Sequence, residues 1–75
     1  MLRFALPRAG RATIQIFDVA GREVNTLFDE AASTGEHEVA WDGRDGHGRG
    51  VAPVVYLARL RTEQGVAARR VVRVR

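Results

Sequence analysis

The chain is 75 residues long, which is enough for a single domain spanning residues 1–75, and such a chain buries only about 60% of its unfolded surface. It has no cysteine for a disulfide bond, and no apolar run approaches the ~20 residues of a membrane-spanning helix. All 12 basic residues are arginine: residues 1–49 hold six against eight acidic residues, whereas residues 50–75 hold six against one. A basic C-terminal third is typical of a surface that meets an acidic partner, an anionic surface or nucleic acid.

The first two predicted strands cover residues 2–6 and 11–18. Every second residue from position 2 to position 6 is large and apolar, as in a half-buried strand, and Pro7 ends the pattern. The next strand is rich in β-branched residues, with Ile14 and Ile16 on one face and Phe17 on the other.

Residues 18–22 form the first predicted hairpin turn, in which Asp18 accepts backbone N–H groups and Gly21 takes a positive φ. The third strand, residues 23–28, has Val24 and Leu27 as core residues. Their spacing breaks the alternation and indicates a bulge or a turn of helix. Residues 29–35 are small and polar, and we expect a loop there.

Three further strands are predicted at residues 36–41, 54–62 and 66–75. Trp41 closes the first of these, a glycine-rich polar loop follows, and residues 63–65 form a hairpin turn between the last two. Six short strands joined by such turns predict an all-β fold, a small antiparallel β-sandwich. On the last strand, the residues expected to face inward are Val66, Ala68, Val72 and Val74.

The loop at residues 42–48 contains two carboxylates and is the first candidate for a metal. An EF-hand loop needs ligand oxygens at alternating positions and a closing Glu, but Arg44 and Pro53 stand at two of these places. We therefore expect Asp42 and Asp45 to accept backbone N–H bonds and hold the turns. A single Ca²⁺ on these two aspartates and backbone carbonyls stays as the alternative.

The residues favour no catalytic site, metal site or cofactor. His37 and His47 lie in separate segments, and without cysteine they do not predict a zinc site. Ser33, the one serine, has none of the surroundings of a nucleophile elbow. A chain this short also has little depth for a pocket of ~300 Å³ or more.

Arginines gather on the last hairpin. If the two strands pair, we expect a basic stripe on the outer face that docks an acidic partner. Sheets that bind nucleic acid usually add stacking aromatics, but this face offers only Val55, Leu57 and Val71, so nucleic acid is the less favoured ligand. The arginines of the expected stripe are Arg59, Arg61, Arg69, Arg73 and Arg75.

Three blocks of the chain follow a family pattern. Residues 14–27 read IQIFDVAGREVNTL, residues 35–45 read GEHEVAWDGRD, and Gly48, Val51, Tyr56, Leu60 and residues 69–72 follow in order. The chain therefore resembles the FlgD-type immunoglobulin-like domain of the flagellar hook-capping protein, and is similar to the C-terminal sorting domains of type IX secretion. The resemblance implies an immunoglobulin-like sandwich of six to seven strands. Its structural motif residues here are Gly21, Arg22, Trp41, Asp42, Gly43, Asp45, Gly48 and Tyr56.

The chain departs from the family in two places. Pro53 and Val54 replace a usual Ser-Gly pair, and an Asn-Pro segment that usually precedes the first strand is missing before Leu2. A missing edge segment leaves N–H and C=O groups unpaired. We therefore expect a homodimer or strand exchange through that edge.

The resemblance implies a non-catalytic C-terminal module of a secreted or cell-surface bacterial protein. It would act in sorting, attachment or protein–protein interaction, with secretion machinery, surface machinery or its own parent protein as partner. A hook-cap assembly domain and a small basic nucleic-acid-binding domain are the alternatives. As part of a longer protein the chain is expected outside the cell; if Met1 is a true start, it is expected in the cytoplasm.

Overall fold

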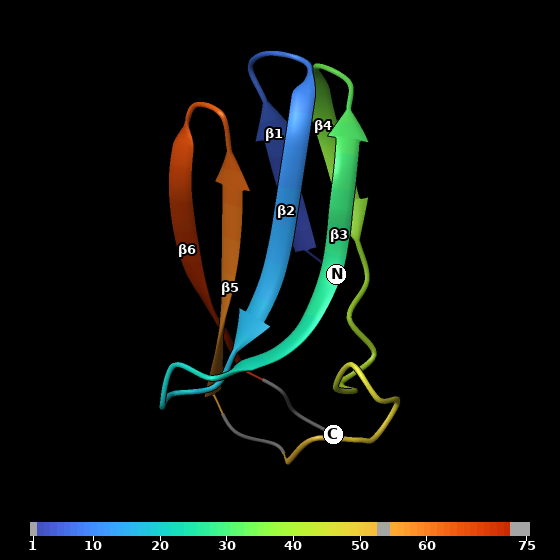
Figure 1. Ribbon diagram of the computed structural model, residues 1–75, viewed down its shortest axis with the longest axis vertical. Helices are drawn as coiled ribbons and strands as arrows, with labels where there is room; N and C mark the ends of the chain where they lie inside the picture. The colour runs from blue at the N-terminus through green and yellow to red at the C-terminus, as the bar shows by residue number, and fades with distance from the viewer. Residues whose placement is uncertain (1, 53–54, 73–75) are drawn as a thin grey trace.

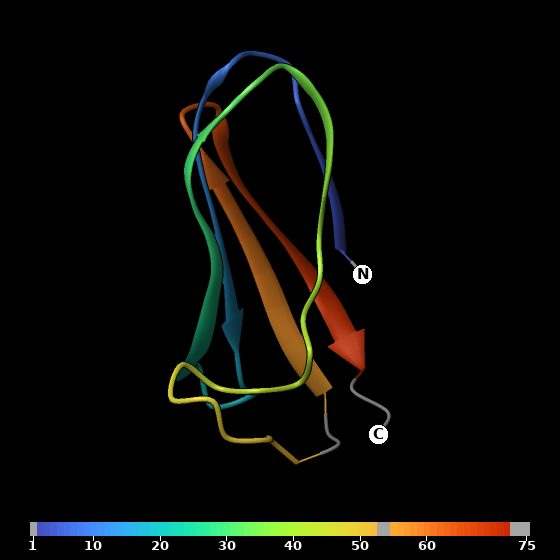
Figure 2. The same ribbon diagram turned by 90° about the vertical axis from the view of Figure 1, so that its right-hand side faces the viewer.

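Six strands form two antiparallel sheets in the computed structural model, which describes residues 2–52 and 55–72 (Figure 1). One sheet pairs β1 with β4, and the other has the order β3-β2-β5-β6. The two sheets lie face to face (Figure 2), so the predicted all-β sandwich is confirmed. In the described part of the chain, no helix is long and apolar enough to cross a membrane. The strands are β1 (Leu2–Leu6), β2 (Gly10–Phe17), β3 (Glu23–Ala32), β4 (Gly35–Val39), β5 (Val55–Thr62) and β6 (Gly65–Val72).

The hydrophobic core lies between the sheets and depends on the alternation along β2 and β5. Ala12 and Ile16 have no exposed surface at all, which marks β2 as the central strand of the fold. One cluster of buried residues consists of Phe4, Leu6, Ala12 and Ile14, and the other of Ile16, Tyr56 and Ala58. Leu2 and Leu27 pack against both clusters and join them.

β3 continues to Ala32, whereas a loop was expected from residue 29. Its last residues stay paired with β2, where Arg11 lies opposite Ala31 and Thr13 opposite Asp29. Arg11 also donates from Nη2 and Nε to one carboxylate oxygen of Asp29, at 2.7 Å and 3.0 Å. Backbone pairing and this charge-assisted contact hold the polar segment in the sheet. Its polar side chains are tolerated there because the outer face of an antiparallel sheet is exposed to water.

The irregular apolar spacing in β3 comes from bulges. The register between β2 and β3 shifts twice, and the unpaired extra residues are Leu27 and Val24. A bulge turns the extra side chain off the regular alternation, so both residues reach the core from the same strand. This confirms them as core residues.

The two faces of β6 are the reverse of those expected. Ala58 lies opposite Arg69 and Leu60 opposite Ala67, and cross-strand partners point to the same side of a sheet. Arg69 therefore shares the inner side with buried Ala58. The cause is the hairpin, which has two loop residues and not three, because Thr62 already pairs with Gly65. A shift of one residue moves every side chain to the other face.

This corrects the expected faces along the whole of β6. Val66 is 61% exposed and Ala68 is also exposed, although both were expected in the core. Val71, expected outside, packs against the second core cluster. The side chain of Val72, and residues Pro53, Val54 and Val74, lie outside the described part.

The small sheet does not cover the large one. β5 and β6 project past β1 at one side of the molecule (Figure 1). Residues 66–70 are consequently exposed on both faces of β6. β1 pairs only with β4 among the described strands, so its other edge is open.

Candidate interaction surfaces

Two loops at one end of the sandwich share the sequence Asp-x-x-Gly-Arg. Residues 18–22 join β2 to β3, and residues 45–49 lie in the long connection from β4 to β5. In the first, Oδ1 of Asp18 accepts the backbone N–H groups of Ala20 and Arg22, both at 2.9 Å. In the second, Oδ1 of Asp45 accepts the equivalent N–H groups two and four residues on, again at 2.9 Å.

The backbone closes both loops in the same way. The glycine N–H donates to the aspartate carbonyl at 3.0 Å in each loop, and the aspartate N–H donates to the arginine carbonyl at 2.9 and 2.8 Å. Gly21 and Gly48 have φ of 85° and 82°, a region that other L-residues adopt only at a cost. The two loops therefore have the same turn structure, and their polar groups hold the backbone of that turn in place.

The two aspartates are held in the ionised form. The backbone N–H of Arg22 lowers the pKa of Asp18 most, against a smaller opposing effect of desolvation, and the N–H of Ala20 lowers it further. The N–H of Arg49 lowers the pKa of Asp45 in the same way, with desolvation opposing and His47 adding. Since their oxygens already accept backbone hydrogens, these carboxylates are poor candidates for acid–base chemistry.

The second loop is fastened to the core by Trp41. Its ring meets Tyr56 edge to face with centroids 5.2 Å apart, and its Nε1–H donates to the carbonyl of Arg44 at 2.9 Å. Asn25 on β3 donates to the same carbonyl at 2.9 Å. On the other side, the hydroxyl of Tyr56 donates to the carbonyl of Ala52 at 2.8 Å. An aromatic pair with a polar end on each ring thus joins core and loop.

The loop is also tied to the edge of β3. The N–H of Gly46 donates to the carbonyl of Val24 at 2.9 Å, at one of the two bulges. The N–H of Val51 donates to the carbonyl of Gly43 at 2.9 Å, and Arg44 and Gly50 form an isolated antiparallel β-bridge. The loop therefore lies against the start of β3, at Val24 and Asn25.

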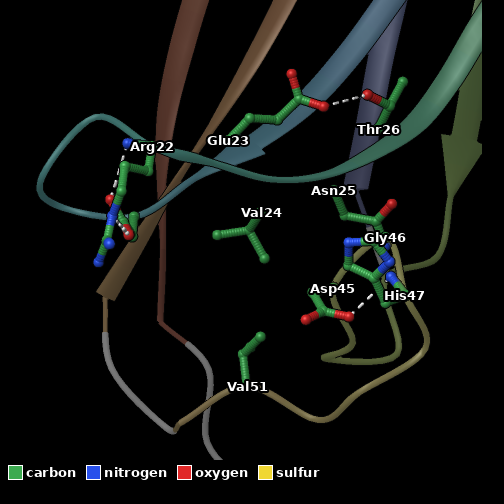
Figure 3. A pocket seen from close by; sticks show the side chains of 10 residues that line it. Arg22, Glu23, Val24, Asn25, Thr26, Asp45, Gly46, His47 and Val51 are labelled. Carbon is green, nitrogen blue, oxygen red and sulfur yellow. Dashed lines mark hydrogen bonds and ion pairs between the residues drawn. The ribbon is translucent and has the colours of Figure 1, made fainter.

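A cavity of about 640 Å³ lies between the two loops and β3. Figure 3 shows Val24 and Val51 in its middle, Arg22 at one side, and Asp45 and His47 at the other. It is wide open to solvent and its aspartates are occupied by the loops themselves. It therefore has the character of a shallow depression between loops.

No group of three or more His, Cys, Asp or Glu residues in the described chain is placed to hold a metal ion. Oδ1 of Asp42 accepts the N–H of Arg44 at 3.1 Å, and its Oδ2 lies 3.4 Å from Nε of the same arginine. His47 lies in the loop, whereas His37 lies on β4 and stacks on Phe4 with centroids 5.1 Å apart. Asp42 and Asp45 thus accept backbone N–H groups within the loop, as predicted.

Ser33 lies in the turn between β3 and β4, and its carbonyl contacts the Nε2 atom of His37 at 2.7 Å. The contact is made by the backbone, so it orients the imidazole and does not activate the hydroxyl.

The arginines of the last hairpin divide between the two faces of the large sheet. Arg59 and Arg61 lie on the outer face of β5, as expected, but Arg69 lies on the inner side. Arg73 and Arg75 are outside the described residues. Arg70, which the sequence reasoning missed, takes the place of Arg69 beside Leu57. The signal that could have found it is the length of the hairpin loop.

Arg59 is held in place by its neighbours on β2. Its guanidinium lies 4.6 Å from the ring centroid of Phe17, and its Nη2 donates to Oε1 of Gln15 at 2.5 Å. Gln15 in turn donates to Glu23 at 2.9 Å. Phe17 thus brings an aromatic ring to this face, which the sequence reasoning had considered free of aromatics, but Arg59 covers it.

The rest of this outer face is open. Arg61 and Arg70 are exposed and make no hydrogen bond or ion pair with any residue that the structure describes. Leu57, which lies between Phe17 on β2 and Arg70 on β6, is 41% exposed, and Arg61 is four residues further along β5. We call Leu57, Arg61 and Arg70 the outer patch. By contrast, Arg11 on β2 forms an ion pair with Asp29 on β3.

The eight motif residues lie in one region. Gly21 and Arg22 belong to the first loop, Trp41 and Tyr56 to the aromatic anchor, and the other four to the connection from β4 to β5 that contains the second loop. Sequence reasoning named the members singly; the repeated Asp-x-x-Gly-Arg pattern shows why two distant segments adopt the same turn.

Comparison with known families gives one match. A family model described as the FlgD Ig-like domain matches residues 2–65, which is most of the chain and ends at the first residue of β6. No curated protein and no solved structure matches the chain significantly.

Proposed function

Because the chain belongs to the FlgD Ig-like domain family, we propose that it is a non-catalytic interaction module that sorts or attaches a longer, exported bacterial protein. Its partner would be an acidic surface on the secretion or surface machinery, or on another part of the same protein. The polar residues of the loop end support a non-catalytic role, since backbone groups already occupy the carboxylates there.

The observation that carries the proposal is the outer patch. It combines two unpaired arginines with an exposed leucine on a sheet face that nothing in the described chain covers. Arginine is enriched in protein interfaces relative to the rest of the protein surface. Its charge selects an acidic partner and favours fast association.

The test is to attach the chain to the C-terminus of a fluorescent reporter that carries an export signal, in the bacterium that encodes it. We expect the reporter to be retained at the cell surface, and we expect Arg61→Glu or Arg70→Glu to release it. Arg8→Glu, at an exposed arginine in the β1–β2 turn, is the matched control. Retention that survives both outer-patch reversals would contradict the proposal.

A role in flagellar hook-cap assembly is the second candidate, and the family match favours it directly. Here the module would be part of a scaffold at the growing hook. A strain whose hook-capping protein carries this chain in place of its own Ig-like domain should then assemble hooks. Failure to do so, with the chimaera stably produced, would leave the sorting role.

We also propose that two copies exchange β1, each pairing it with β4 of the other, and so form a homodimer in which the second edge of β1 stays free. Exchange is favoured over side-by-side pairing because β5 and β6 project past β1 and would meet the large sheet of the second copy. Light scattering at high concentration should detect the dimer. A monomer throughout the concentration range would rule it out.

A further inference from the structure

An apolar groove runs along the open side of the sandwich, between β1 and the projecting strands β5 and β6. Its volume is about 220 Å³. One wall is β1, with Leu2 and Phe4, and the floor is made by Ile14, Ala58 and Leu60. Ala67 and Arg69 form the far side. The groove is separate from the outer patch, which lies on the opposite face of the same hairpin.

The edge of β1 that borders the groove has no neighbouring strand in the described chain. In an antiparallel pair, alternate N–H and C=O groups point to the partner and the others point away. The groups of β1 that point away from β4 have no neighbouring strand in the described chain. A strand added there would pair with them and lie over Ala67, whose side chain faces the groove and is exposed.

The dimensions favour an extended segment over a small ligand or a second sandwich. The volume is below the ~300–1,000 Å³ of typical small-molecule sites. Symmetric pairing of two β1 strands would put both large sheets on the same side, where β5 and β6 already project (Figure 1). A single strand avoids this overlap.

The charge at the groove defines the chemistry of the segment. Arg69 makes no ion pair with the described residues, and it lies at the end of the groove near Leu2, since Ala58 opposite it belongs to the cluster that Leu2 packs against. Arg3, the other cation of the lining, is already paired with Glu38 at 2.8 Å. No acidic residue is among those that line the groove.

We propose that the groove binds an extended partner segment by strand addition to β1. The segment has aliphatic side chains at alternating positions, which fill the groove, and an acidic residue that pairs with Arg69. Backbone pairing supplies affinity, and the small side chains of Ala58 and Ala67 set the size of the guest residues. This rests on the proposed role as an interaction module and specifies a second contact, apart from the outer patch.

The probe is a fluorescein-labelled synthetic peptide in which valine and threonine alternate between a glutamate at each end. Fluorescence anisotropy should show saturable binding with a Kd of about 1 mM or tighter. We expect Arg69→Glu to weaken it roughly three- to tenfold, because reversal replaces attraction by repulsion. Arg70→Glu, the same change one residue on and on the opposite face, should alter it less than about twofold.

A second pair of variants tests the apolar floor. Ala67→Glu puts a charge in the groove and should weaken binding by about tenfold or more, whereas Val66→Glu, on the outer side of the same strand, should not. Both positions are exposed, so neither change should prevent folding. Amide hydrogen exchange should slow in β1 when the peptide is bound.

Several outcomes would overturn the proposal. These are no saturable binding, equal effects of the Arg69 and Arg70 reversals, equal binding of a peptide with arginine at both ends, or a homodimer that displaces the peptide. Loss of surface retention in Arg70→Glu with peptide binding intact would separate the two contacts. Peptide binding without any effect of outer-patch variants on retention would support the groove and contradict the proposed docking face.

Discussion

At the scale of the residue, Asp18 and Asp45 have the same structural role in two loops: each holds a turn through backbone hydrogen bonds. In each aspartate, Oδ1 accepts two backbone N–H groups, and the glycine three residues later supplies the positive φ that lets the turn close. The same hydrogen bonds lower the pKa of both groups, so the geometry of the loops depends on their being ionised.

Stability should fall in acid for this reason. The pKa of each aspartate is lower in the folded chain than in the unfolded one, so the stabilisation is complete above the ordinary pKa, 3.8. It is lost as the pH falls from there through the folded values. Urea unfolding at pH 6 and near pH 3 measures this loss.

The variant Asp18→Asn with Asp45→Asn should be less stable at pH 6 and should show a smaller difference between the two pH values. Glu30→Gln removes an exposed carboxylate that makes no hydrogen bond with the described residues, and is the control. An unchanged pH dependence in the double variant would show that other groups cause the acid loss.

At the scale of the element, position in the sheet decides how much each strand contributes. β2 has a neighbour on both sides and its inner residues are fully covered, whereas β6 is an edge strand beyond the small sheet. The two strands are of equal length, eight residues, and both are rich in apolar residues, so composition alone does not separate them.

Truncation of the two strands should have very different costs. Ile16→Ala should destabilise the fold by about 2–5 kcal/mol, because it removes a fully buried side chain and leaves a cavity. Val66→Ala should change the free energy of unfolding by no more than about 0.5 kcal/mol, because this side chain is 61% exposed. Chemical denaturation of the two variants gives the comparison. A large loss in Val66→Ala would indicate that β6 is covered in solution.

At the scale of the whole molecule, the charge is asymmetric across the large sheet. Acidic residues pair with arginine or glutamine around β2 and β3, whereas the outer patch at β5 and β6 is unpaired. A net charge of +3 is small, and the ring of Phe17 that could stack on a base lies under Arg59.

Nucleic acid should therefore bind weakly and non-specifically. With two or three arginines available, the logarithm of the binding constant should fall with the logarithm of salt concentration with a slope of about −2 to −3. Binding of a labelled DNA oligonucleotide should vanish near ~0.15 M salt. Tight binding that persists at this salt concentration, or that depends on base sequence, would favour the nucleic-acid function over docking of an acidic protein.

The local patterns of this chain determined the order of its six strands, its first hairpin turn and its family. Alternation identified Ile14 and Ile16 as core, and the Asp-x-x-Gly spacing identified the first loop, because these features depend on a residue and its near neighbours. The tertiary structure alone decided which arginines lie together. One loop residue fewer in the last hairpin moved Arg69 to the groove and Arg70 to the outer patch. It also decided that β5 and β6 project past β1. Pairing register and sheet overlap are set by contacts between distant segments, and no local pattern contains them.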